Sequence, residues 1–200
     1  MQLRPRRYSI ARRTTCDERL QAAVDEARSS FISQKVRNLT KRASLRYPEA
    51  DMRSIDFSEG RGLDRVAVAE LAACGFAERG DNVVLLGPKG TGKTHLSCAL
   101  AKAACAKRVR TCYIRQPDLE DLRRESRDRS GGERKPLRKY GAFGLLVIDE
   151  WLLERPDELF RGCFWSISSC ATGGRRPSCV RSSERKASTR GSEACTRTRS

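Results

Sequence analysis

Three short apolar runs alternate with helical patterns through the middle of the chain. Asn82–Leu86 and Leu145–Ile148 are apolar almost throughout, which is typical of strands buried on both faces of a parallel sheet. Val109–Ile114 is a third strand candidate. The Ala-rich segment Thr94–Ala106 and the segment that opens at Pro117 favour helices between these strands. The order strand, helix, strand, helix, strand predicts an α/β domain with a parallel sheet.

The N-terminal part of the chain has a helical pattern instead. Thr15 and Glu18 have the spacing of a capping box, which marks the start of a helix. Apolar residues then recur at helical spacing at Leu20, Val24, Ala27 and Phe31. Tyr47-Pro48 should end the pattern, because the residue before a proline avoids helical backbone. We expect residues 15–48 to form a small unit of one or two helices, preceded by a basic, disordered arm at 1–14.

A polar linker joins this helical unit to the α/β domain, which we place at residues 49–161. Within the linker, Ile55 and Phe57 are expected to pack on the domain that follows. Asp64 is a candidate N-cap for a further helix that runs to about Glu78.

Positive charge dominates the chain and gathers in three segments, residues 1–48, 123–139 and 162–200. The formal net charge is +16, and residues 1–48 alone hold 12 basic and 4 acidic residues. Charge concentrated in this way favours a polyanionic partner, DNA or RNA, and DNA is the partner we name. The alternative is that the basic residues are simply solvated.

The composition also bears on the compartment. No apolar run approaches the ~18 residues that a membrane span needs, and no secretory signal follows the first arginines. The 9 cysteines form no CxxC pair, which disfavours a zinc ribbon or a disulfide framework. We therefore expect a cytoplasmic protein with no membrane partner, whose cysteines are mostly small apolar residues.

Gly87–Thr94 reads GPKGTGKT and fits the phosphate-binding pattern GxxxxGK[ST]. Glycines let such a loop curl its N–H groups around a phosphate, and the helix that follows adds its positive N-terminus. Lys93 is expected to reach the β- and γ-phosphates of ATP as a catalytic residue, and the Thr94 hydroxyl to hold Mg²⁺. The candidate nucleotide-binding residues are Gly87, Pro88, Lys89, Gly90, Thr91, Gly92, Lys93, Thr94 and His95.

Two members of this set have a second interpretation. Lys89 adds positive charge near the phosphates or is merely solvated. His95 is the only histidine of the chain, and without a visible partner a packing or capping role is favoured over catalysis.

Asp149 and Glu150 follow the apolar run Leu145–Ile148, ~55 residues after the phosphate loop. A carboxylate at the end of a neighbouring strand is the expected partner of Mg²⁺, which makes Asp149 the second metal-site residue. Glu150 is the candidate general base that polarises the attacking water. Without the preceding loop, the pair would be read as a loop carboxylate or a helix cap.

Residues from about Arg42 to Glu158 resemble the IstB-like ATP-binding proteins, which are helper ATPases of a bacterial transposon class. These proteins are close relatives of the DnaC helicase loaders and belong to the AAA+ group. The resemblance rests on Asp56-Phe57, Asn82–Leu86 with Gly87–Thr94, His95-Leu96, Ala99-Leu100-Ala101, Cys105, Asp118-Leu119, and Tyr140 before Leu145–Glu150.

The resemblance implies a P-loop NTPase fold of the AAA+/ASCE-like type and an ATPase that uses ATP and Mg²⁺. Gly87–Thr94 would be its Walker A motif and Asp149-Glu150 its Walker B motif. The family implies a homo-oligomer on DNA that hands the DNA to a transposase partner. It also implies ATP between subunits, with an arginine from a neighbour, and no residue here matches that arginine. The N-terminal helices would bind DNA or the partner.

The resemblance stops after about Arg161. Residues 162–200 contain no Leu and no Asp, and Ile167 and Val180 are their only β-branched aliphatic residues. Such a segment buries too little apolar area to order itself, so we expect it to be disordered. Codon degeneracy permits apolar, family-like residues in the adjacent reading frame here. Our hypothesis is that this tail is an out-of-frame translation.

This tail has a consequence for the sheet. The fold implied by the resemblance needs a fourth strand between the phosphate-loop strand and the Walker B strand, and that strand carries a polar sensor. We expect the tail to leave this slot empty and the sheet incomplete at its C-terminus. Backbone groups of the flanking strands would be unpaired, at ~1–3 kcal/mol each, so the chain would bind ATP weakly or fold unstably.

Three functions stay open from the sequence. The leading one is an IstB-like, DNA-associated ATPase that assists transposition. A DnaC-like loader of a replicative helicase shares the chemistry and differs in its partner. A non-catalytic DNA-binding remnant would use only the basic helices, and Lys93→Ala would then change nothing.

Overall fold

The computed structural model describes residues 15–58, 62–127, 139–151, 162, 177–184 and 195–198. The chain divides into two compact units, Met1–Lys35 and Val36–Ser200. The predicted arm at 1–14 and most of the tail at 162–200 lie outside the described residues. No described helix is both long and apolar enough to cross a membrane.

Helix α1 (Cys16–Arg42) begins in the first unit, as the sequence predicts, and its last residues belong to the second unit. The Glu18 N–H donates to Thr15 Oγ1 at 3.3 Å and the Thr15 N–H donates to Glu18 Oε2 at 2.8 Å, which confirms the capping box. No residue of α1 is buried, and Leu20 and Phe31 are 65% and 70% exposed. The helix ends at Arg42, a few residues before the predicted end.

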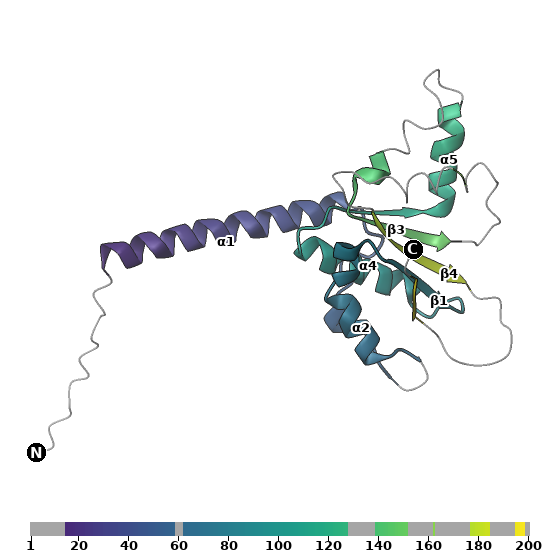
Figure 1. Cartoon of the computed structure of the whole chain (residues 1–200), viewed down its shortest axis with the longest axis horizontal. Helices are drawn as coiled ribbons and strands as arrows, with labels where there is room; N and C mark the ends of the chain where they lie inside the picture. The colour runs from purple at the N-terminus through teal and green to yellow at the C-terminus, as the bar shows by residue number, and fades with distance from the viewer. Residues whose placement is uncertain are drawn as a thin grey trace, which may run out of the picture. The chain divides into compact units, whose positions relative to one another are not determined.

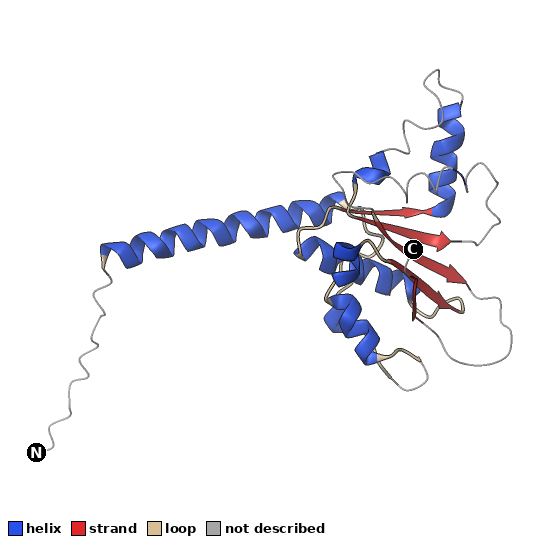
Figure 2. Ribbon diagram, in the orientation of Figure 1, coloured by secondary structure: helices blue, strands red, loops and turns tan. Residues whose placement is uncertain are grey.

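The second unit is built on a sheet with the strand order β2-β3-β4-β1-β5 (Figure 2). The first four strands in this order pair in parallel, and β5 pairs antiparallel to β1. The strands are β1 (Asn82–Gly87), β2 (Thr111–Arg115), β3 (Leu145–Trp151), β4 (Ser178–Glu184) and β5 (Cys195–Thr198). The predicted α/β class and parallel sheet are confirmed.

Helices lie on both faces of this sheet (Figure 1). They are η1 (Met52–Ser54), α2 (Arg65–Ala72), α3 (Gly75–Arg79), α4 (Lys93–Ala106), α5 (Gln116–Arg127) and η2 (Lys139–Ala142). Leu145 and Val147 pack with α4 in one cluster, while Leu146 and Ile148 pack with Leu119 of α5 in another. Successive residues of β3 therefore face opposite sides, and both sides are buried, as its continuous apolar run predicts.

The helix predicted from Asp64 to about Glu78 is interrupted. Asp64 caps it as expected, accepting the Val66 N–H at 2.9 Å. The chain then leaves helical geometry at Cys74, whose φ is 54°, and resumes as α3. The break turns Phe76 into the core, where it is 2% exposed. Burial of a large aromatic side chain thus outweighs local helix propensity.

The expectation that residues 162–200 leave the fourth slot empty is wrong. β4 lies between β1 and β3, with Val83 and Val147 opposite Val180, and Leu85 opposite Ser182. Only Cys179 and Val180 supply buried apolar side chains, both 0% exposed. Pairing on two sides satisfies the backbone of β4, so a strand forms there with little hydrophobicity of its own. The unpaired backbone groups expected in β1 and β3 are therefore paired.

Candidate functional site

The phosphate loop connects β1 to α4 in the way the sequence predicts. β1 ends at Gly87 and α4 begins at Lys93. Gly90 and Gly92 have φ values of 83° and 87°, which L-residues with a Cβ rarely adopt. A Cβ at Gly90 would meet nothing within 4 Å, so the conformation itself, and not space, requires glycine there. The result is a backbone concavity at the N-terminus of a 14-residue helix, which suits an anion.

Lys93 folds back over this loop. Its ammonium Nζ donates to the Gly87 carbonyl at 2.9 Å and to the Pro88 carbonyl at 2.5 Å. The Thr91 hydroxyl donates to the same Pro88 carbonyl at 3.0 Å. The Lys93 ammonium is thus held at the loop, where it can donate to the phosphate oxygens of a bound ligand. Lys89, in contrast, is exposed.

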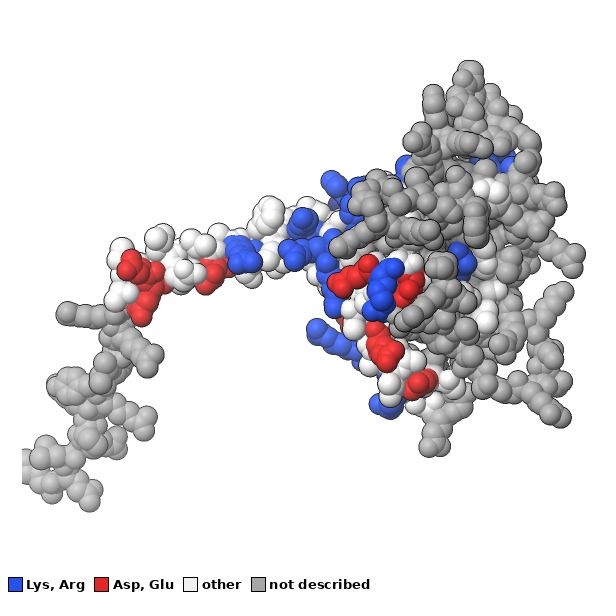
Figure 3. All heavy atoms as spheres, in the orientation of Figure 1, with Lys and Arg blue, Asp and Glu red and all other residues white. Residues whose placement is uncertain are grey.

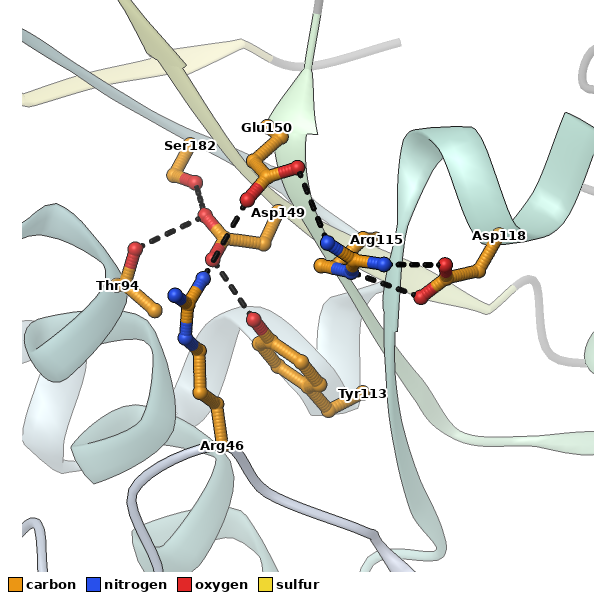
Figure 4. Close-up of polar contacts among 8 residues, drawn as sticks. All are labelled: Arg46, Thr94, Tyr113, Arg115, Asp118, Asp149, Glu150 and Ser182. Carbon is orange, nitrogen blue, oxygen red and sulfur yellow. Dashed lines mark hydrogen bonds and ion pairs between the residues drawn. The ribbon is translucent and has the colours of Figure 1, made fainter.

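Asp149 lies at the centre of the polar site and joins four elements (Figure 4). Its Oδ1 accepts from the Thr94 hydroxyl of α4 at 3.2 Å and from the Ser182 hydroxyl of β4. Its Oδ2 accepts from the Tyr113 hydroxyl of β2 at 2.7 Å. The residue is 2% exposed, and these bonds offset the cost of burying its carboxylate.

The surroundings of Asp149 suit a hard cation. Burial, followed by the hydrogen bond and charge of Asp149, raises the pKa of Tyr113 well above its usual value, so the phenol stays a donor. A carboxylate oxygen and a threonine hydroxyl in contact form the kind of oxygen donor set that Mg²⁺ takes. Asp149 and Thr94, the two predicted metal-site residues, are therefore brought together although 55 positions separate them.

Glu150 follows Asp149 but has a different environment. Its φ is 57°, a strained value for a residue with a side chain, and the register between β3 and β4 shifts between Ile148 and Trp151. Its Oε1 lies 3.3 Å from Arg46 Nη1 and its Oε2 lies 3.8 Å from Arg115 Nη1. The Glu150 side chain is 28% exposed, so solvent reaches it, unlike the buried Asp149.

A cavity of about 430 Å³ opens beside the phosphate loop. The linker residue Ile55 and residues of α2 form one part of its wall, and His95 and Leu96 of α4 form another. Its lining is mainly apolar, through Leu63, Val68, Leu71 and Leu85 among others. Ile55 thus packs on the domain as predicted. His95 also packs beside Tyr47, with ring centroids 6.1 Å apart, which agrees with the packing interpretation.

The sequence predicted the phosphate loop, Asp149 and Glu150, but not the residues that form hydrogen bonds and ion pairs with the two carboxylates. Tyr113 and Ser182 come from strands whose neighbours are fixed only by the fold, and Arg46 lies in a segment assigned to the helical unit. A usable signal existed for Tyr113, because a polar ring near the end of a predicted parallel strand should lie at the same edge as Asp149.

A parallel sheet with helices on both faces, a phosphate loop after β1 and a buried aspartate at the end of β3 define a P-loop nucleotide-binding domain. The family described as IstB-like ATP binding protein matches residues 9–159. The chain belongs to this family of insertion-sequence ATP-binding proteins.

Individual relatives agree with this assignment. An IS1162 insertion-sequence protein of Pseudomonas fluorescens, named for ATP binding, is 32% identical over 160 residues, 80% of this chain. A protein of the same description from IS5376 of Geobacillus stearothermophilus is 31% identical over 118 residues, 59% of this chain. The chain spans 68% of the first relative's length and 46% of the second's.

Solved structures show the same fold. The crystal structure of the DnaC helicase loader matches with a TM-score of 0.58 at 21% identity, covering 72% of this chain and 81% of that one. AMPPCP-bound DnaA from Aquifex aeolicus matches with a TM-score of 0.57 at 23% identity, covering 69% of this chain and 43% of that one. These neighbours share the α/β fold of this chain.

Proposed function

We propose that this chain binds ATP with Mg²⁺, hydrolyses it, and acts as a DNA-associated helper ATPase of an insertion sequence. The observation that carries the proposal is the contact of Thr94 with the buried Asp149 beside a glycine-formed phosphate loop. Membership in the IstB-like family supports ATP as the nucleotide.

Each part of the site has a separate role at the phosphates. The loop N–H groups and the N-terminus of α4 bind the phosphate oxygens, and Lys93 exchanges its carbonyl partners for the β- and γ-phosphates. Thr94 and Asp149 would hold Mg²⁺, which neutralises charge on the phosphates when it is bound. Glu150 polarises the water that attacks the γ-phosphate, since it is the solvent-accessible carboxylate next to this site.

The cavity beside the loop takes the base of the nucleotide. Its apolar lining suits a flat aromatic ring, and Thr91, Gly92 and Lys93 belong to both the cavity and the phosphate loop. A ligand whose phosphates occupy the loop can therefore extend its other end into the cavity. Ile55, from the linker, would contact the base.

Binding of ATP can be tested with one variant and a matched control. Titration calorimetry of the full chain with ATP and Mg²⁺ should give saturable binding, and Lys93→Ala should weaken it at least tenfold. Lys102→Ala removes the same charge from the same helix, where Lys102 pairs with Asp51 at 3.8 Å, and should leave the affinity unchanged. Absence of binding by the unaltered chain, or equal affinity of Lys93→Ala, would overturn the proposal.

The partners follow from charge and from the relatives. The second half of α1 carries Lys35, Arg37, Lys41 and Arg42, which suits the phosphate backbone of DNA. The relatives are named for insertion sequences, so a transposase is the proposed protein partner. We further propose a homo-oligomer in the cytoplasm, in which a neighbour's arginine completes the ATP site.

A helicase-loader function is the second candidate, because the fold matches that of the DnaC helicase loader. The insertion-sequence names of the relatives favour transposition over loading. Co-purification of the tagged chain with the transposase encoded beside its gene would support the first function. Co-purification with a replicative helicase instead would support the second.

A further inference from the structure

We propose that Arg46 is a positioning residue that holds Glu150 in an ion pair and thereby limits the rate of ATP hydrolysis. The inference rests on the proposed ATPase function and concerns the control of that site. Arg46 lies outside both the phosphate loop and the strand that carries Asp149 and Glu150.

Both carboxylate oxygens of Glu150 face a guanidinium group. Arg46 Nη1 lies 3.3 Å from Oε1, where it donates a hydrogen bond, and Arg115 Nη1 lies 3.8 Å from Oε2 (Figure 4). A general base must accept a proton from water on one of these oxygens. The ion pair with Arg46 therefore competes directly with the attacking water for Oε1.

The two arginines are not equivalent. Arg115 forms two hydrogen bonds with Asp118, at 2.6 and 2.9 Å, so that carboxylate holds its guanidinium. Its distance to Glu150 is also the longer of the two. Removing Arg46 should therefore free Oε1 of Glu150, while Arg115 remains fixed by Asp118 beside Oε2.

The segment that carries Arg46 is itself fixed in the core. Ala43, Leu45 and Ala50 are buried, and the Ala43 carbonyl accepts the backbone N–H of Tyr113 at 2.9 Å. The base of the Arg46 side chain thus has a defined place beside β2. The Arg46 side chain is nonetheless 48% exposed, and an ion pair at this exposure is weak enough to open during turnover.

The backbone at Glu150 makes this restraint effective. The left-handed φ of 57° and the register shift after Ile148 set Glu150 apart from the regular strand. Its carboxylate therefore leaves the sheet and meets a residue of the segment that follows α1.

Steady-state ATPase assays on the full chain test this inference. Arg46→Ala should raise kcat about two- to fivefold, the range expected for losing a half-exposed ion pair, and should leave the KM for ATP within twofold. Arg46→Lys keeps the charge and should restore the wild-type kcat. Arg53→Ala removes an exposed arginine a few residues later and should not change the rate.

A double variant shows whether the gain passes through Glu150. In Glu150→Gln/Arg46→Ala the rate should equal that of Glu150→Gln alone, because no base is left to release. Arg46→Gln retains much of the side chain and serves if Arg46→Ala fails to fold.

Failure of this inference can be distinguished from failure of the proposed function. If calorimetry shows no ATP binding by the unaltered chain, both the proposed ATPase function and this inference are wrong. If the unaltered chain binds and hydrolyses ATP, an Arg46→Ala kcat that is unchanged or lower overturns the role of Arg46 alone. If neither protein hydrolyses ATP, the ATPase proposal and this inference both fail.

Discussion

Asp149 accepts hydroxyl hydrogen bonds from Thr94, Tyr113 and Ser182, which come from three different elements. A buried carboxylate left without such partners would destabilise the domain. The same bonds orient the carboxylate toward Thr94, where a cation would be held. At the scale of single residues, the polar site is therefore part of what holds β2, β3, β4 and α4 together.

Burial of two titratable side chains, Cys112 and Tyr140, in the core cluster that contains Leu119 of α5 predicts a loss of stability at alkaline pH. Burial raises the pKa of the Cys112 thiol from 9.0 to about 11 and that of Tyr140 from 10.0 to about 12. These groups keep their protons in the folded chain at a pH where the unfolded chain has lost them. Their contribution to stability is therefore complete below pH 9 and decreases as the pH rises toward 11 and 12.

Urea unfolding at pH 8 and pH 10.5 measures this decrease. The free energy of unfolding of the unaltered chain should fall from pH 8 to pH 10.5. In Cys112→Ala this fall should be smaller by about 1–2 kcal/mol. Cys16→Ala makes the same substitution at an exposed position and should leave the loss unchanged. An equal loss in all three proteins would show that burial of Cys112 does not contribute.

At the scale of elements, β4 depends on its neighbours more than on its own sequence. β1 and β3 can be recognised in the sequence because each contains a continuous apolar run. β4 has no such run, since its sequence is SCVRSSE. Its place is set by the backbone pairing that β1 and β3 offer on both sides. The parallel sheet could therefore be predicted from the sequence, but the occupant of its central slot could not.

The candidate site could likewise be predicted only in part from the sequence. The phosphate loop and Asp149-Glu150 are local patterns, in which residue type and spacing already carry the chemistry. Ser182, Tyr113 and Arg46 act through contacts between segments that are 33, 36 and 104 positions apart, respectively. No short-range pattern encodes such contacts, because they follow from strand order and from the path of the chain after α1.

A matched pair of substitutions tests whether residues 178–184 form the central strand. Val180 is 0% exposed between β1 and β3, so Val180→Ala should lower the free energy of unfolding by about 1–3 kcal/mol. Val66 is 68% exposed on α2, and Val66→Ala should change it by less than about 0.5 kcal/mol. Equal unfolding free energies of the two variants in denaturant titrations would contradict the assignment of β4.

At the scale of the whole molecule, charge is unevenly distributed. The chain carries a net charge of +16, and the side chains of α1 change sign along the helix (Figure 3). Asp17 and Glu18 lie in its first turn and Lys41 and Arg42 in its last turn. Each sign lies at the helix end where the macrodipole favours it, which stabilises a helix without buried residues. Its basic half remains available to an anionic partner.

Binding of duplex DNA should therefore depend steeply on salt and on the basic half of α1. Each phosphate that a lysine or arginine neutralises contributes about −0.9 to the slope of log affinity against log salt concentration. Lys41→Ala/Arg42→Ala should weaken binding and make this slope shallower by about two in fluorescence anisotropy titrations. Arg53→Ala removes a positive charge from η1 and should retain the wild-type slope. A double variant that binds DNA with unchanged affinity and slope would place the contact elsewhere, since two lost phosphate contacts cannot leave counterion release unaltered.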